Sequence, residues 1–296
     1  MSTTRASRRI PHLPRPASAS DVLTELYERV TATCEALSAR VAAADGAEPT
    51  ASRANPQQQV SGAALGQDPA ALDRFVQAES ARIQRREAHT ARRDVAASRA
   101  LHGYAWSVAL LMSGAWYLER RVPRIRPGDI QVDLETGAVE VTPGQVFSCL
   151  ADDEAARDGL PGARTLVDAE ALRAELRSAV ADHLRPLLTA IAPEVRRGPR
   201  ALWGMVEDDL ISGIWYLGRM LGEEENAIRA ATELLPGPVP PFPGGAAFRH
   251  LTGDSGRTYP TRTRLGCCLY YTIGPAQPCL NCPRTTDAER LRRLEP

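Results

Sequence analysis

The sequence contains no lysine, so all 36 of its lysine-plus-arginine positions are arginine. Aspartate and glutamate together also number 36, and the formal net charge is therefore zero. A surface that binds nucleic acid needs an excess of basic charge on one face, so this balance argues against a nucleic-acid partner. The missing lysine and the abundant alanine fit a GC-rich coding bias better than a need for guanidinium chemistry.

Aromatic residues are also scarce, at 5% of the chain, although apolar residues as a whole make up 43%. That apolar content is typical of a globular protein rather than a disordered one. A chain of 296 residues is long enough to bury a sizeable core, as one large domain or two modest ones.

The arginine-rich first residues are not followed by the apolar segment of a secretory signal. We therefore expect a cytoplasmic protein whose thiols stay reduced. A stretch of nineteen residues without Asp, Glu, Lys or Arg, 100–118, is close to the minimum span of a bilayer. It contains His102 and continues from a charged helical pattern, so we predict a buried helix of a soluble core rather than a membrane span.

Common motifs of nucleotide, flavin and histidine-metal sites are also missing from the sequence. No G-x-G-x-x-G or P-loop pattern follows a predicted strand. The five histidines show no HExxH or H-x3-H spacing, and no serine lies in a nucleophile-elbow pattern. The chemistry of this chain therefore has to come from its six cysteines, and no catalytic side chain is predicted beyond them.

Four of the six cysteines lie in one short C-terminal segment: Cys267, Cys268, Cys279 and Cys282. Their spacing, C-C-x10-C-x2-C, supplies four thiolates, a soft ligand set that selects zinc, copper(I) or an iron–sulfur cluster. A structural zinc site usually uses two separated C-x2-C hooks. Two adjacent cysteines reach one small ion only with backbone strain, whereas a two-iron cluster is broader. The spacing therefore favours a [2Fe–2S] cluster on these four cysteines, with zinc as the alternative.

The remaining cysteines, Cys34 and Cys149, stand alone in the sequence. Cys34 falls on an apolar stripe of a predicted helix. Free cysteine is among the most often buried residue types, so we expect both side chains to be buried and to ligate nothing.

The C-terminal motif resembles that of the ferric-siderophore reductases of the FhuF type. Those proteins have the same cysteine spacing, often with an arginine before it and Leu-Tyr-Tyr after the vicinal pair. This chain matches the pattern at Arg264, Cys267, Cys268, Leu269, Tyr270, Tyr271, Cys279, Cys282 and Pro283. A weaker likeness begins at Ala201-Leu202-Trp203-Gly204 and continues through Ile211-Ser212-Gly213.

The resemblance implies a cytoplasmic [2Fe–2S] oxidoreductase that passes one electron to a ferric hydroxamate siderophore, which then releases Fe(II). It also implies an external electron donor, such as a ferredoxin or a reductase, and peripheral contact with a siderophore permease at the inner face of the membrane. Other functions stay open: an iron–sulfur redox sensor, a ferredoxin-like electron carrier, or an interaction protein stapled by zinc.

Three arginines flank the cysteines in sequence: Arg262, Arg264 and Arg284. Positive charge near a cluster stabilises its reduced, more anionic form, and it would also attract an acidic electron donor. We therefore expect these arginines to raise the potential of the cluster.

Hydrophobic patterning predicts an α+β protein that is mainly helical, with a small antiparallel sheet and a C-terminal cluster-binding loop. Residues 1–66 are expected to form a disordered start, a helix and a flexible loop. Ser18 or Ser20 is a suitable N-cap for that helix, which is predicted to run to about Ala44. The loop, 45–66, is rich in Gly, Pro and Gln.

Residues 67–236 are expected to form the helical body, with a β-hairpin near 130–142 where apolar and polar residues alternate. A Pro/Gly-rich linker, 237–245, is predicted to tether a cluster-binding module at 246–296.

Within the body, one or two helices are predicted from Pro69 to about Arg121, and two more at 168–191 and 199–222. The acidic run 207–209 lies inside the last of these helices. Charged runs on helices usually face water, so we expect this run to be solvated.

Overall fold

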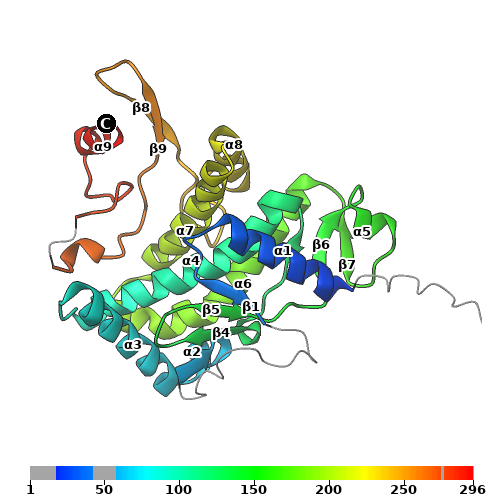
Figure 1. Ribbon diagram of the computed structural model, residues 1–296, viewed down its shortest axis with the longest axis horizontal. Coiled ribbons are helices and arrows are strands. Elements are labelled where there is room, and N and C mark those ends of the chain that lie inside the picture. The colour runs from blue at the N-terminus through cyan, green and yellow to red at the C-terminus, as the bar shows by residue number, and fades with distance from the viewer. Residues whose placement is uncertain (1–17, 43–57, 275–276, 296) are drawn as a thin grey trace, which may run out of the picture.

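The computed structural model describes residues 18–42, 58–274 and 277–295. Within these ranges the chain is a mixed α+β protein in which long helices form the centre and short sheets lie around them (Figure 1). The predicted α+β class is therefore confirmed. The segment 1–17, predicted to be disordered, lies outside the described residues.

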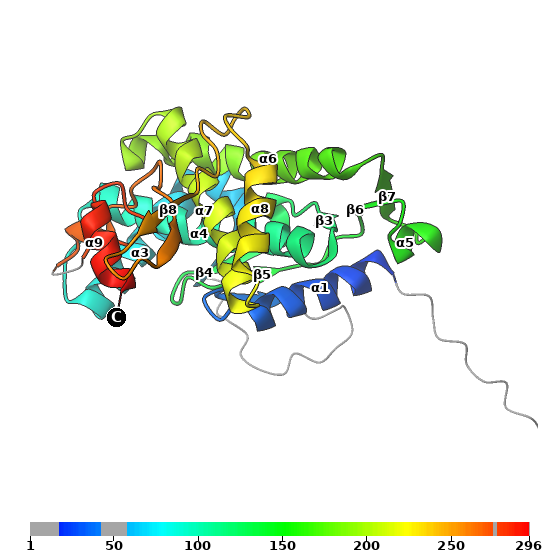
Figure 2. The same cartoon turned by 90° about the horizontal axis from the view of Figure 1, so that it is seen from above.

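Three long helices make the centre of the molecule: α4 (Arg93–Glu119), α6 (Ala169–Val195) and α7 (Pro199–Met220). Helix α4 packs against both α6 and α7. Helix α3 (Pro69–Glu87) packs on α4, and α8 (Glu224–Leu234) packs on α7 (Figure 2). The helices predicted for the body are confirmed.

The uncharged stretch 100–118 lies inside α4, and most of its residues are buried. Small residues let neighbouring helices approach closely. A Cβ added at Gly114 would lie 2.9 Å from a methyl group of Val30, and one at Gly213 would lie 3.1 Å from Leu110. Protein neighbours therefore cover the apolar stretch. Among the described helices, none is long and apolar enough to cross a membrane.

The predicted hairpin is present, since β4 (Ile130–Asp133) pairs antiparallel with β5 (Val139–Val141) and alternate residues are buried. It belongs to a four-stranded sheet of order β1-β5-β4-β2. Strand β2 (Gln59–Ser61) runs antiparallel to β4, but β1 (Ala39–Val41) runs parallel to β5. The sheet is therefore mixed rather than antiparallel as predicted, because β1 joins its edge parallel to β5.

A second sheet holds β3 (Val122–Pro123), β6 (Phe147–Leu150) and β7 (Ala163–Leu166), with β6 and β7 parallel. A third is the antiparallel hairpin of β8 (Arg249–Thr252) and β9 (Thr258–Thr261). The short helices are α2 (Gly62–Gln67), α5 (Glu154–Arg157) and α9 (Asp287–Leu294), with 3-10 turns η2 (Pro127–Asp129) and η3 (Tyr270–Thr272).

The N-terminal region differs from the prediction at two points. Helix α1 (Ala19–Thr33) begins at the predicted cap Ser18 but ends at Cys34, well before Ala44. The chain then enters β1, where pairing with β5 outweighs the local helical pattern. The predicted loop 45–66 is wrong at its end, because β2 and α2 begin within it. Residues 43–57 lie outside the described part.

The Pro/Gly-rich segment 237–245 is irregular, as predicted for a linker, but it packs against the body. Phe242 is 1% exposed and meets Trp203 of α7 edge to face, with ring centroids 5.8 Å apart. The backbone N–H of Gly244 donates to the carboxylate of Glu207 at 2.9 Å. The C-terminal segment therefore starts from a fixed position on α7.

Candidate metal centre

The four cysteines of the C-terminal motif line one small pocket, together with Arg264, Gly266, Tyr270, Tyr271 and Pro278. Cys268 and Cys282 are buried, Cys267 is half-buried and Cys279 is exposed. The side chains that the spacing singled out therefore come together in space, with one edge of the group open to solvent. Their role as ligands stays a prediction. Both isolated cysteines, Cys34 and Cys149, are buried as expected.

One pair of sulfur atoms is arranged as a metal would require. The Sγ atoms of Cys267 and Cys282 lie 4.0 Å apart. Two thiolates bound tetrahedrally to one ion, with bonds of about 2.3 Å as in zinc sites, lie roughly 3.8 Å apart. In the part of the chain that the structure describes, no set of three or more His, Cys, Asp or Glu side chains is arranged to hold an ion.

The donor set fits an iron–sulfur cluster in its chemistry, since thiolates are the ligands that such clusters use. Four thiols gather in one pocket, and two of them are spaced as for a shared ion. Cys267 and Cys268 enter the pocket from one turn, and Cys279 and Cys282 enter from another. A bound cluster would be held by these four residues.

Backbone hydrogen bonds shape the two turns and tie them together. The N–H of Leu269 donates to the Sγ of Cys267 at 3.4 Å, and Leu269 itself has a left-handed φ of 61°. The N–H of Cys282 donates to the carbonyl of Cys279 at 3.0 Å, which closes the C-x2-C turn. The N–H of Arg264 donates to the carbonyl of Asn281 at 2.9 Å, so the segment before the vicinal pair is fastened to the second turn.

The acidic run of α7 holds the cysteine loop in place, which corrects the prediction that it is solvated. Glu207, Asp208 and Asp209 are all fully buried. Asp208 accepts hydrogen bonds from the backbone N–H of Leu265 at 3.0 Å and of Gly266 at 2.7 Å. Partners from the C-terminal segment satisfy this carboxylate, as burial of a charge requires.

Arg262 is the buried counter-ion of Asp208 rather than a residue at the edge of the pocket. Its Nη2 donates to Asp208 at 2.9 Å, its Nε to the carbonyl of Ala246 at 3.0 Å, and its side chain is fully buried. Burial lowers the pKa of the Arg262 guanidinium, although Asp208 opposes the shift. Arg262 therefore anchors the C-terminal segment to α7, which differs from the flanking role predicted for it.

Arg264 is the cation that lines the pocket of the cysteines. Its Nη2 donates to Asp209 at 2.6 Å, and Nδ1 of His102 lies 2.8 Å from the same carboxylate. Burial opposes the charge of Arg264, but Asp209 and Asp208 outweigh it and raise its pKa. Burial lowers the pKa of His102 despite Asp209. The carboxylate thus orients a permanently charged guanidinium beside the thiols.

Two further arginines reach the vicinal pair from the helical body. Nη1 of Arg99, on α4, lies 3.5 Å from the Sγ of Cys268, and its guanidinium lies 5.0 Å from the ring centroid of Tyr270. Nη1 of Arg197, in the turn between α6 and α7, donates to the carbonyl of Cys267 at 2.5 Å. The positive charge around the thiols therefore comes from three separate elements.

Two of the four thiols resist ionisation. Although Cys279 lies at the exposed edge of the group, loss of solvent around its sulfur raises its pKa to about 11, with the neighbouring cysteines adding to the shift and Arg264 opposing it. Burial also raises the pKa of Cys267, and its neighbours Cys282 and Cys268 act in the same direction. Four thiolates in one pocket repel one another, so a bound cation or cluster would be needed to hold them all in the charged form.

Several contributors to this site were not predicted from the sequence: Arg99, Arg197, His102 and the acidic run of α7. Arg99 and Cys268 are 169 positions apart, and no local pattern connects them. The burial of the three acids could have been predicted from the sequence of α7. They lie between apolar residues on every side of the helix, and such a helix has no face left for water.

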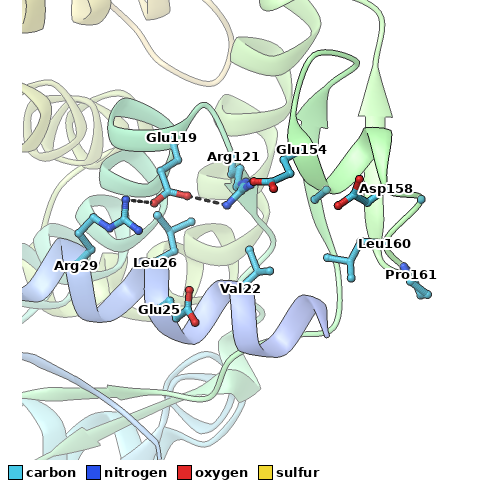
Figure 3. Close-up of a pocket in the computed structure, with 12 residues that line it drawn as sticks. Val22, Glu25, Leu26, Arg29, Glu119, Arg121, Glu154, Asp158, Leu160 and Pro161 are labelled. Carbon is cyan, nitrogen blue, oxygen red and sulfur yellow. Dashed lines mark hydrogen bonds and ion pairs between the residues drawn. The ribbon is translucent and has the colours of Figure 1, made fainter. Parts of the chain in front are cut away.

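The roomiest cavities lie away from the cysteines. One of about 400 Å³ lies between α1 and the segment around α5, at the other end of the molecule from the C-terminal segment (Figures 1 and 3). Three of its charged residues form an ion-pair network, with Glu119 2.5 Å from Arg29 and 2.7 Å from Arg121. Figure 3 shows these three side chains on one wall of the pocket.

A second cavity, of about 610 Å³, is lined in part by His183. Both ring nitrogens of this histidine have partners, since Tyr104 Oη and the carbonyl of Ile125 each lie 2.8 Å away. Its burial lowers its pKa to about 4. This histidine is therefore a satisfied core residue.

Comparison with models of known protein families finds no match to this chain. Comparison with curated proteins finds no significant relative either.

Proposed function

We propose that this protein is a cytoplasmic [2Fe–2S] ferric-siderophore reductase. The observation that carries the proposal is the meeting of Cys267, Cys268, Cys279 and Cys282 in one pocket beside the guanidinium groups of Arg264 and Arg99. The spacing of the cysteines favours a two-iron cluster, and the likeness of the C-terminal motif to FhuF-type reductases suggests the electron acceptor.

The chain's own residues would bind the cluster and control access to it. When bound, the cluster supplies one electron to the Fe(III) of a ferric hydroxamate siderophore. Fe(II) is held much more weakly by hard oxygen ligands, so it then leaves the chelator. Cys279 lies at the exposed edge of the group, whereas Cys268 and Cys282 are covered by protein. Cys279 is therefore the motif cysteine that is most open to solvent.

The electron has to be replaced from outside the chain, by a ferredoxin or a reductase. The body lacks a sequence motif for a nicotinamide or a flavin. The guanidinium groups near the thiols favour an acidic donor. Peripheral contact with a siderophore permease at the inner face of the membrane would deliver the substrate to the same place.

Anaerobic purification of the full-length protein tests the cofactor. We expect red-brown protein with about two irons and two sulfides per chain and an electron paramagnetic resonance signal after reduction with dithionite. Replacing any one of the four motif cysteines by serine should bleach the visible bands, whereas Cys34→Ser and Cys149→Ser should leave them intact. A colourless protein that contains zinc would instead support the alternative function, an interaction protein whose C-terminal segment is held together by zinc.

Stopped-flow reoxidation of the reduced protein tests the reaction. Ferric trihydroxamate is added in increasing concentration together with an Fe(II) chelator. We expect a saturating rate of reoxidation and Fe(II) release in equal amounts. Reoxidation without Fe(II), or no reoxidation at all, would overturn the reductase proposal and leave an electron carrier or a sensor.

A further inference from the structure

A cleft lined with arginine lies directly beside the cysteine pocket. It has a volume of about 140 Å³ and is enclosed by α3, α4 and the β4–β5 hairpin. Its lining includes Arg82, Arg86, Arg99 and the aromatic rings of Phe75 and Tyr104. This volume accommodates an arm of several heavy atoms but not a whole ferric chelate.

Positive charge dominates the lining of the cleft. Glu79 is its single acidic lining residue among the described ones, and this carboxylate is already paired with Arg82 at 2.6 Å. Arg82 also donates to the carbonyl of Leu134 at 2.6 Å, so its role is structural. Arg86 and Arg99 are left as the cations that can meet a ligand.

Neither of these two arginines is fully engaged by protein acceptors. The side chain of Arg86 is 59% exposed, and its ion pair with Glu87, at 3.0 Å, is a surface pair that contributes little. The Nε–H of Arg99 is buried and meets no acceptor among the described residues. A buried N–H without a partner is unfavourable, and an oxygen ligand in the cleft would satisfy it.

Arg99 connects the cleft to the candidate metal centre. It lines the cleft, and its Nη1 also lies 3.5 Å from the Sγ of Cys268. Tyr270, which lines the cysteine pocket, donates to Glu87, the neighbour of Arg86 at the end of α3, so the C-terminal segment is also tied to the helix that carries Arg86. An oxygen bound to Arg99 would therefore be separated from Cys268 by one side chain.

We propose that this arginine cleft binds a carboxylate-bearing arm of the ferric chelate and so selects anionic over neutral siderophores. The proposal rests on the proposed reductase function and names its substrate class. Planar guanidinium groups match carboxylate geometry and form charge-assisted hydrogen bonds, whereas a neutral amide in the same place gains only ordinary ones.

Binding is tested with the cluster-loaded protein and chelates that cannot be reduced. The probes are the Ga(III) complexes of a trihydroxamate that carries one free carboxylate and of the same chelator with this carboxylate converted to an amide. Isothermal titration calorimetry at low salt should show about tenfold tighter binding of the carboxylate form. The preference should weaken as the salt concentration rises.

Two variants of neighbouring residues on α3 separate direct contact from general charge. Arg86→Gln removes a cation that lines the cleft and should abolish the preference for the carboxylate. Arg85→Gln removes the same charge one residue away, where the side chain donates to the carbonyl of Glu135 outside the cleft lining, and it should keep the preference. Equal affinity of the wild-type protein for both probes, or equal losses in the two variants, would overturn the proposal.

The Fe(III) forms of the same two chelates distinguish this inference from the function on which it rests. Reduction of both at equal rates, with Fe(II) release, would overturn the selectivity and leave the reductase standing. If the carboxylate form binds more tightly but neither chelate is reduced, the cleft is still a carboxylate site and the proposed reductase function is wrong.

Discussion

At the scale of single residues, the three consecutive acids of α7 have separate tasks. Glu207 holds the linker through Gly244, Asp208 holds the loop before the vicinal pair, and Asp209 orients Arg264. Burial raises the pKa of both Glu207 and Asp208. The stability of this region therefore depends on pH and on partners from the C-terminal segment.

Glu207 should make the protein less stable as pH rises toward neutrality. Burial raises its pKa to about 7, so the folded chain keeps a proton that the unfolded chain has released. The free energy of unfolding should fall by about 1–3 kcal/mol as pH rises from about 4.5 to about 7. Glu207→Gln mimics the protonated form and should reduce this fall.

Urea unfolding at pH 5 and pH 8 measures the effect. The exposed Glu225 serves as a control, and Glu225→Gln should unfold with the same pH dependence as the wild-type protein. An unchanged pH dependence in Glu207→Gln would show that this carboxylate ionises normally.

Arg264 should raise the reduction potential of the cluster. Its guanidinium lines the pocket of the cysteines and carries a permanent charge that Asp209 orients. Arg264→Gln should lower the potential by roughly 50 mV, which corresponds to about 1 kcal/mol for one electron. Protein-film voltammetry measures the shift.

Arg284→Gln is the matched control, because the Arg284 side chain is exposed and stacks on Tyr271. The effect of this variant on the potential should be smaller and should vanish at high salt.

At the scale of elements, helix α7 is the support on which the cysteine loop is built. Its N-terminal half is buried on all sides, and the loop approaches so closely that a Cβ at Gly266 would lie 2.6 Å from the side chain of Met205. The helix predicted for this segment is present. Helical periodicity did not show whether its three acidic side chains face water or protein. Only the docking of the C-terminal segment supplies their partners.

Gly266→Ala should displace the vicinal cysteines. The added methyl group cannot fit against Met205 without moving the loop, and Gly266 also donates to Asp208. We expect incomplete loading of the cluster, measured as a lower ratio of visible to protein absorbance, and a loss of about 1–3 kcal/mol in stability. Gly128→Ala, where an added Cβ meets nothing within 4 Å, should load normally. Equal loading of both variants would contradict the close approach.

At the scale of the whole molecule, the cysteine loop joins segments that lie far apart in the described chain. Arg99 comes from α4, Arg197 from the turn before α7, and Arg262 from the strand region that follows the linker. The body has a continuous hydrophobic core to which the four cysteines do not belong. Loss of the cluster should therefore loosen the C-terminal segment and leave the body folded.

The variant with all four motif cysteines changed to serine tests this division. Far-ultraviolet circular dichroism should keep its helical signal, because the helices of the body pack without the loop. Hydrogen exchange should become faster in 262–285 and stay slow in α4 and α6. Faster exchange throughout the chain would mean that the cluster is needed to fold the body.

The sequence by itself determined the features that depend on neighbouring residues. The predicted cap Ser18 and the alternation in the β4–β5 hairpin are local signals, and both identified elements that the structure contains. The spacing of the four cysteines likewise identified the segment that forms a single pocket.

Tertiary structure decided which side chains surround that pocket. Asp208 and Arg262 are 54 positions apart, and each would be expected in water if only its own segment were considered. Burial brings the two charges together because neither can leave water without the other. Tertiary packing also places Arg99 beside Cys268, 169 positions away, so the electrostatics of the candidate site could not be read from any local pattern.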